Sequence, residues 1–308
     1  MAMVPHVREI AQRFGAAITV LNAFELIPDY ALPPRREDGC DTEAAINPYT
    51  PALQEVRKQR EQRLKEFSCT QFPGLTQTAR IEDGDPATVI DWVAKHENTD
   101  LIVMPTRGFG RFRRLLLGSI TAKVLHDVIC PVLTSAHEPE QALASPGGYR
   151  SIICALELGP QANVVLKTAG LLAQAYGARM CLLHMEPSSD EHTEQASAQS
   201  VRYAFDQAFS KEGPDVGAGL SVRVLDAAIP EGIRRAAIEE RADLVVVGRG
   251  HQKGALSRAW SHLYTSSANH RVPFSVCDVR FVRARIPPAH VNQSLRAEFS
   301  RLFPAGAA

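Results

Sequence analysis

The sequence predicts two α/β domains, each a doubly wound parallel sheet with helices on both faces. Two observations lead to this prediction: short apolar runs alternate with helical patterns, and the whole series occurs twice. Residues 89–108 align with residues 232–251, and each stretch runs from a helical pattern through Asp-Leu into a β-branched run. A repeat of this length indicates a duplicated domain rather than a solenoid unit.

The second repeat gives the clearest order of elements. Strands are expected at 151–158, 179–185, 221–226, 243–248 and 273–279. Helices are expected at 161–177, 197–210, 230–241 and 257–269. The domains are therefore placed at 1–140 and 149–280, across a seam rich in Pro, Gly, Ser and Ala at 137–150. In the tail, 281–308, apolar residues at helical spacing predict an amphipathic helix at 289–303 that docks on the protein.

The first repeat begins differently. It opens on a helical pattern at residues 4–15, the counterpart of 161–177, so its sheet would lack the first strand. Three arrangements are open: another segment inserts, the second strand pairs directly with the fourth, or the chain is truncated. We favour truncation, and expect the coding sequence upstream of Met1 to encode a short apolar strand.

Composition narrows the classes of function. Lys and Arg number 34, as do Asp and Glu, so the net charge gives no general attraction to nucleic acid or to an anionic membrane. No window reaches the ~18 apolar residues of a membrane span, and no secretory leader is visible, so we expect a cytoplasmic protein. The six cysteines form no C-x-x-C pair and four lie in apolar runs, which favours buried free thiols over zinc or disulfides.

Residues 107–119, RGFGRFRRLLLGS, connect an apolar strand to a helix. Gly108 allows a tight turn and the close approach of a ligand. Gly118 and Ser119 lie where unpaired N–H groups and the helix dipole favour an anion. Positive potential comes from four arginines of the loop, Arg107, Arg111, Arg113 and Arg114. The stretch matches neither Walker A nor the dinucleotide fingerprint, and it predicts phosphate contact, with simple helix capping by Ser119 as the alternative.

Residues 100–134, DLIVMPTRGFGRFRRLLLGSITAKVLHDVICPVLT, resemble the C-terminal half of a universal stress protein domain. Nucleotide-binding members of that family carry G-x2-G-x9-G-[ST]. At those four positions this sequence has Pro105, Gly108, Gly118 and Ser119, so proline replaces the first glycine. The resemblance extends over residues 4–280. It implies tandem Rossmann-like domains, similar to the adenine nucleotide alpha hydrolases, with strand order 3-2-1-4-5.

The resemblance further implies a stress-response or sensing module that binds ATP or AMP, with or without Mg²⁺, and is not an enzyme. The nucleotide site of the first domain would consist of Gly108, Gly118, Ser119, Ile120, Ala23 and Arg111. In the second domain Gly248 matches the first glycine and Glu157 stands where an Asp flanks the ribose. The other motif positions are replaced there by His251, Ser261 and His262, so the second site would be degenerate.

Paired domains of the family associate through their last strands, for which residues 130–135 and 273–278 are the counterparts here. The resemblance is also compatible with a homodimer, and it implies neither nucleic acid nor membrane as a partner. Two other functions stay open. One is a nucleotide-free scaffold with the same fold, which Pro105 favours. The other is a slow ATPase, for which the sequence shows no catalytic base.

Overall fold

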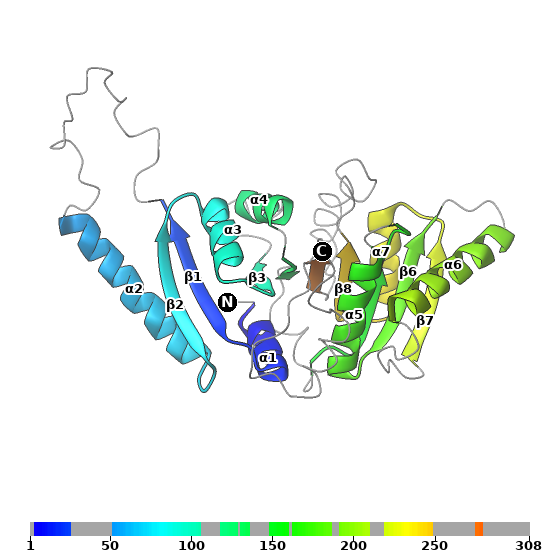
Figure 1. Ribbon diagram of the computed structural model, residues 1–308, viewed down its shortest axis with the longest axis horizontal. Helices are drawn as coiled ribbons and strands as arrows, with labels where there is room; N and C mark the ends of the chain where they lie inside the picture. The colour runs from blue at the N-terminus through cyan, green and yellow to red at the C-terminus, as the bar shows by residue number, and fades with distance from the viewer. Residues whose placement is uncertain are drawn as a thin grey trace, which may run out of the picture. The chain divides into compact units, whose positions relative to one another are not determined.

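The computed structural model describes residues 3–25, 51–105, 118–128, 130–135, 148–159, 162–186, 191–209, 219–248 and 275–279. The predicted helices at 257–269 and 289–303 lie outside these residues. The chain forms two compact units, a larger one of Met1–Gly15 with Thr99–Ala308 and a smaller one of Ala16–Asn98 (Figure 1). Within the described ranges, no helix is long and apolar enough to cross a membrane.

The larger unit contains a seven-stranded sheet in the order β3-β4-β9-β8-β5-β6-β7. Its strands are β3 (Ile102–Pro105), β4 (Val132–Ser135), β5 (Ser151–Ala155), β6 (Arg179–Met185), β7 (Leu220–Leu225), β8 (Leu244–Gly248) and β9 (Ser275–Val279). The five strands of the second repeat are parallel in the order β7-β6-β5-β8-β9. This is the predicted 3-2-1-4-5 order, and the predicted strands of this repeat are confirmed to within a few residues at their ends.

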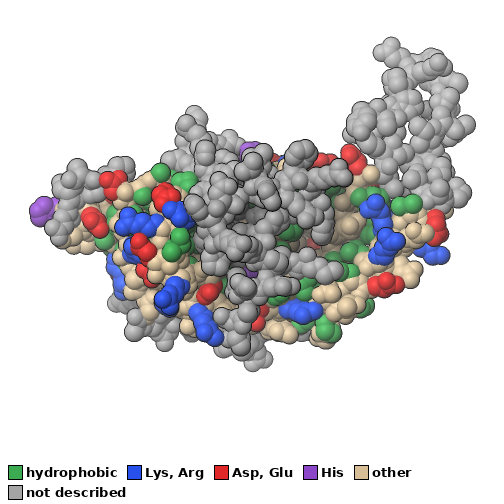
Figure 2. Space-filling model, turned by 180° about the vertical axis from the view of Figure 1, so that it is seen from behind, with side chains coloured by type: hydrophobic (Ala, Val, Ile, Leu, Met, Phe, Trp, Pro, Cys, Tyr) green, Lys and Arg blue, Asp and Glu red, His purple; other side chains and the backbone are tan. Residues whose placement is uncertain are grey.

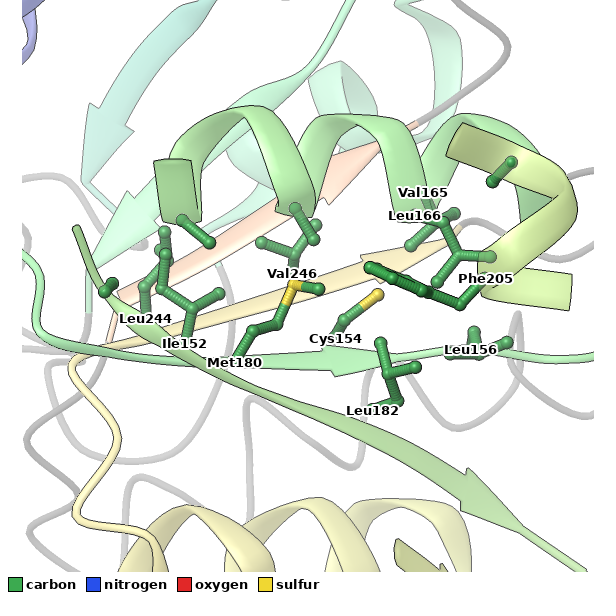
Figure 3. Packing of buried hydrophobic residues seen from close by; sticks show 14 of the residues in the cluster. Ile152, Cys154, Leu156, Val165, Leu166, Met180, Leu182, Phe205, Leu244 and Val246 are labelled. Carbon is green, nitrogen blue, oxygen red and sulfur yellow. The ribbon is translucent and has the colours of Figure 1, made fainter. Parts of the chain in front are cut away.

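Helices cover both faces of the second-repeat sheet. One face packs against α5 (Ala162–Tyr176) and α6 (Glu191–Phe209), and the other against α7 (Ile229–Glu239). On the first face, the side chains shown in Figure 3 include Ile152, Cys154, Leu156, Val165, Leu166, Met180, Leu182, Phe205, Leu244 and Val246. Because alternate residues of each strand are buried on the opposite face, the strand sequences are apolar throughout.

The cysteines within this core are free thiols. Cys154 lies on the face covered by α5, and Cys181 lies on the face covered by α7. Burial raises the pKa of both thiols, so they stay protonated and behave as small apolar side chains. Cys130 is a buried thiol outside any disulfide of the described residues, as the sequence predicted, whereas Cys69 is exposed.

The two repeats meet in an antiparallel strand pair. In β4, Val132 lies opposite Asp278 of β9, and Ser135 lies opposite Ser275. This pair joins β3 and β4 of the first repeat to the five strands of the second, as expected for residues 130–135 and 273–278. Each strand would otherwise be the edge of its own sheet, where unpaired backbone groups invite aggregation.

The smaller unit consists of a parallel pair of strands with two helices. The strands are β1 (Ile18–Phe24) and β2 (Gln77–Asp83), and the helices are α2 (Pro51–Gln71) and α3 (Pro86–His96). Asp85 caps α3, because its carboxylate accepts the Thr88 N–H at 2.9 Å. Within the described chain β1 pairs with β2 alone, so direct pairing of the second and fourth strands of this repeat is not observed.

Matching contacts in the two repeats support duplication. Gly15 ends α1 (Val4–Phe14) with a φ of 60°, and Gly177 follows α5 with a φ of 61°. Arg80 of β2 forms an ion pair with Glu97, which follows α3. At the corresponding place in the second repeat, Arg223 forms an ion pair with Glu240, which follows α7. The distance from Arg223 Nη1 to Glu240 Oε1 is 3.2 Å.

Charges of both signs are interspersed on the described surface shown in Figure 2. Within the described helices, ion pairs about one turn apart include Asp91 with Lys95 and Glu231 with Arg234. This distribution agrees with the zero net charge of the chain.

The helix α1 of the first repeat is tied to the second repeat by a buried histidine. His6 Nδ1 lies 2.7 Å from the hydroxyl oxygen of Tyr149, and the two rings stack with their centroids 5.9 Å apart. The Tyr149 ring meets Tyr176 of α5 edge-on at 5.0 Å. Burial lowers the pKa of His6 to about 4, because the charged imidazolium would lose its hydration there.

This burial predicts a pH-dependent loss of stability. The folded protein favours neutral His6, so the contribution is complete above the ordinary pKa of 6.5 and decreases as the pH falls toward 4. His6→Gln cannot titrate, and should reduce the difference in unfolding free energy between pH 7.5 and pH 4.5 by up to about 3 kcal/mol. Urea denaturation at pH 7.5 and at pH 4.5 measures this difference in the free energy of unfolding. His126→Gln, which removes an exposed histidine, is the control, and equal pH dependence in both variants would contradict the prediction.

Candidate functional site

The candidate anion site lies at the start of α4 (Ser119–Asp127). Gly118 is the N-cap residue, with φ −61° and ψ 143°, and among the described residues no side chain caps the helix. Ser119 is therefore the first helical residue rather than the N-cap, so the capping alternative for its hydroxyl is not observed. The N–H groups of the first turn have no acceptor within the helix, and they lie at the positive end of its dipole.

A hydrogen bond fixes this helix start to the sheet. The Thr121 hydroxyl donates to the Pro105 carbonyl oxygen at 3.1 Å, and Thr121 is buried in the first turn of α4. Pro105 is the last residue of β3, so the bond holds the N-terminus of α4 next to the carboxyl end of a parallel strand. Ligands of doubly wound sheets bind at such ends.

Sequence reasoning did not select Thr121. Its only signal was a hydroxyl residue in the first turn of the helix, two positions after Ser119. Its partner is a backbone carbonyl, which no side-chain motif reveals. Thr121 is a positioning residue, because it holds the helix start in place and has its hydroxyl committed to Pro105.

The structure describes some of the predicted site residues and leaves others outside the described ranges. Gly118, Ser119 and Ile120 lie together at the start of α4, and Ile120 is 43% exposed. Ala23 is a half-buried residue near the end of β1 in the smaller unit. Gly108 and Arg111 lie outside the described residues, as do His251, Ser261 and His262 of the second repeat.

Carboxylates follow three strands of the second repeat. Exposed Glu157 comes after β5, Glu186 follows β6, and exposed Asp226 follows β7. Glu186 accepts a hydrogen bond from Ser197 of α6. In the described segments after these strands no Lys or Arg balances the carboxylates, and negative potential disfavours phosphate. The degenerate second site stays a prediction, because positions 251, 261 and 262 lie outside the described residues.

Gly248 at the end of β8 has a packing role. A Cβ atom added there would lie 2.7 Å from Cγ2 of Val165 on α5, closer than real contacts allow. The close approach of helix to strand therefore requires glycine at this position. Sequence reasoning matched Gly248 to the first glycine of the phosphate loop, but the glycine needs no phosphate to explain it.

The fold and this helix start define a tandem, Rossmann-like α/β protein, with two repeats joined through their last strands. A model of the Universal stress protein family matches residues 2–135 and 148–279. The chain therefore belongs to the universal stress protein family, and it carries the family domain twice.

Individual relatives agree with this assignment. The chain is 33% identical over 123 residues to the "Universal stress protein in QAH/OAS sulfhydrylase 3'region" of Thermus aquaticus, covering 40% of this chain and 80% of the relative. It is 29% identical over 128 residues to "Universal stress protein MJ0531" of Methanocaldococcus jannaschii, covering 42% of this chain and 69% of the relative. A universal stress protein structure from Archaeoglobus fulgidus matches 91% of this chain and 93% of its own, with a TM-score of 0.63 and 17% identity, which supports the fold.

The contact of Gly248 with Val165 gives a prediction about packing. Gly248→Ala should lower the free energy of unfolding by about 1–3 kcal/mol, because the new methyl group overlaps Val165. In a protein that already carries Val165→Ala, Gly248→Ala should lower the free energy of unfolding by less, since the overlapping Cγ2 atom is gone. Chemical denaturation of the four proteins measures the coupling.

Gly159→Ala is the matched control, because a Cβ atom at Gly159 has open space around it. If Gly248→Ala lowers the free energy of unfolding equally in the parent and in Val165→Ala, the packing role of Gly248 is excluded.

Proposed function

We propose that this universal stress protein binds an adenine nucleotide, ATP or AMP, through its first repeat at residues 105–120. The phosphates would lie at the start of α4, held by backbone N–H groups and the hydroxyl of Ser119. Gly108 and Arg111 would complete the phosphate contacts, and Ala23 would flank the adenosine. The second repeat would serve as a structural partner of the first.

The observation that carries this proposal is the helix start that Thr121 fixes at the carboxyl end of β3. The conformation of Gly118 supports it as well. Any residue can adopt a φ of −61° with a ψ of 143°, so the backbone itself does not require glycine there. A position without a Cβ atom suits the close approach of a phosphate oxygen.

The chemistry of the described groups supports binding rather than catalysis. Backbone N–H groups and a hydroxyl stabilise an anion, but neither removes a proton from an attacking nucleophile near neutral pH. We therefore propose a sensing role, in which nucleotide occupancy reports on the state of the cell. Any ATPase activity would be slow.

A substitution at Gly118 tests the assignment. Gly118→Val should abolish the stabilisation that ATP or AMP gives the parent protein, because a branched side chain occupies the phosphate position. In a thermal-shift titration, ligand at 100 times Kd stabilises the parent by about 2.7 kcal/mol. Gly159→Val is the matched control, since it adds the same side chain after β5 of the second repeat, where there is open space.

The control should keep the nucleotide response of the parent. Loss of response in Gly159→Val with retention in Gly118→Val would place the nucleotide in the second repeat and refute the assignment.

A second function is favoured by Pro105. Proline removes the N–H donor that the family's first glycine supplies, and it fixes φ. A nucleotide-free scaffold with the same fold would tolerate that change. The parent protein should then show no thermal shift at millimolar ATP or AMP, so the same titration separates the two functions.

A further inference from the structure

The helix α1 belongs to the first repeat in sequence, but its side chains pack against the second repeat. Met3, just before the helix, belongs to the apolar cluster on one face of the second-repeat sheet, and Ile10 packs against that cluster. Phe14 meets the ring of Tyr176 on α5 edge-on, with the ring centroids 6.4 Å apart. In the described chain no backbone hydrogen bond joins α1 to the second repeat, so side chains alone hold the helix there.

The sheet of the second repeat does not depend on α1 for its own hydrogen bonds. The strand β5 pairs with β6 on one edge and with β8 on the other. Side chains of α5 and α6 fill most of the cluster on this face. A segment held by few contacts opens locally at a lower free energy than the whole fold. Release of α1 would therefore leave the hydrogen bonds of this sheet intact.

Gly15 provides a hinge at the end of α1. Its φ is 60°, in the left-handed region that favours glycine, and its N–H donates to the Ala11 carbonyl oxygen. The boundary between the two compact units falls directly after Gly15, because α1 is grouped with the larger unit and β1 with the smaller one. A change of backbone angles at Gly15 therefore moves residues 4–14 as one segment and requires no change within β1.

His6 is the buried titratable group of this contact, and it is 4% exposed. From the second repeat, Tyr149 contacts it through the hydrogen bond and the ring stack, and Tyr176 lies against Tyr149. On α1 itself, Glu9 pairs with Arg13 at 3.4 Å, and Arg13 lies over the Tyr176 ring at 5.1 Å. Loss of hydration on burial is the cause of the lowered pKa of His6.

A second buried polar group also favours release. The hydroxyl oxygen of Tyr176 is buried and has no hydrogen-bond partner among the described residues. An unpaired buried hydroxyl destabilises the state that buries it. Phe14 and Arg13 of α1 both lie on the Tyr176 ring, so release of α1 uncovers that ring.

We propose that protonation of His6 releases α1 from the second repeat in mildly acidic solution, with Gly15 as the hinge and with the second-repeat sheet still folded. The released imidazolium regains the water that the buried site excludes. Because the seated helix binds the proton more weakly than the released helix, acid favours release. At pH 5.5, one unit below the ordinary pKa of 6.5, the ratio of released to seated helix is about tenfold its value at neutral pH. The proposal is independent of nucleotide binding.

Native-state hydrogen exchange of the full-length protein without nucleotide tests the release. Protection factors, corrected for intrinsic exchange rates, are compared at pH 7.5 and pH 5.5, a range in which carboxylates ordinarily keep their charge. Protection of residues 7–14 should be lower than that of β5 and β6 at both pH values, and should fall by about tenfold at pH 5.5.

Low concentrations of urea separate local release from global unfolding. Exchange of residues 7–14 should hardly respond to urea, because release of one helix exposes little surface. Exchange of β5 and β6 should become faster with urea, because these strands exchange only when the whole unit unfolds.

Variants assign the effect of pH to His6. His6→Gln cannot titrate, so the protection of residues 7–14 should no longer change between pH 7.5 and pH 5.5. His192→Gln, which replaces an exposed histidine on α6, is the matched control and should keep the tenfold change of the parent. Tyr149→Phe removes the hydrogen bond but leaves His6 buried, so it should lower protection at both pH values and keep the pH dependence. Circular dichroism establishes that each variant is folded.

Three results would overturn the proposal. The first is equal protection of residues 7–14 at pH 7.5 and pH 5.5 in the parent. The second is the same pH dependence in folded His6→Gln as in the parent. The third is equal protection and equal urea dependence in residues 7–14 and in β5, since α1 would then leave the second repeat only when the whole unit unfolds.

Discussion

The antiparallel pairing of β4 with β9 is the constraint on which the larger unit depends. Each strand comes last in its repeat, and each needs an acceptor and a donor for its backbone groups along both edges. The pairing of Val132–Ser135 with Ser275–Asp278 satisfies these groups and makes one sheet from two repeats. The buried side chains of Val132 and Leu133 add apolar area to that junction. The contact of His6 with Tyr149 joins α1 to the second repeat as well.

Duplication has left the two repeats unequal in chemistry, although they correspond in structure. The start of α4 offers backbone N–H groups, a hydroxyl and a glycine that the local backbone does not require. At the end of β8, the counterpart of β3 in the second repeat, Gly248 is explained by its contact with Val165. Packing explains Gly248, whereas the local backbone does not explain Gly118. A nucleotide site in one repeat and a structural role in the other agree with this difference.

The comparison of Asn22 with His184 illustrates how a residue depends on its neighbouring strand. Both residues stand at the same place near the end of the second strand, and both carry a polar side chain. His184 Nδ1 lies 3.0 Å from the carbonyl oxygen of Leu156, whereas the buried side-chain oxygen of Asn22 has no donor among the described residues. In the described chain β1 pairs with one strand, whereas β6 pairs with two.

The resemblance to the universal stress protein family predicted the pairing of the last strands. The sequence by itself determined the α/β class, the duplication, and the strands and described helices of the second repeat. These follow from apolar periodicity and from the requirement to bury both faces of a parallel sheet, which are local properties repeated along the chain. It also located the glycine-serine pair at a helix start. Only the tertiary structure decided that Thr121 fixes that start to Pro105, that Gly248 faces Val165, and that the side-chain oxygen of Asn22 has no donor among the described residues. The reason is physical: each of these facts depends on which atoms from distant parts of the chain approach within a few ångströms, and periodicity does not specify such distances.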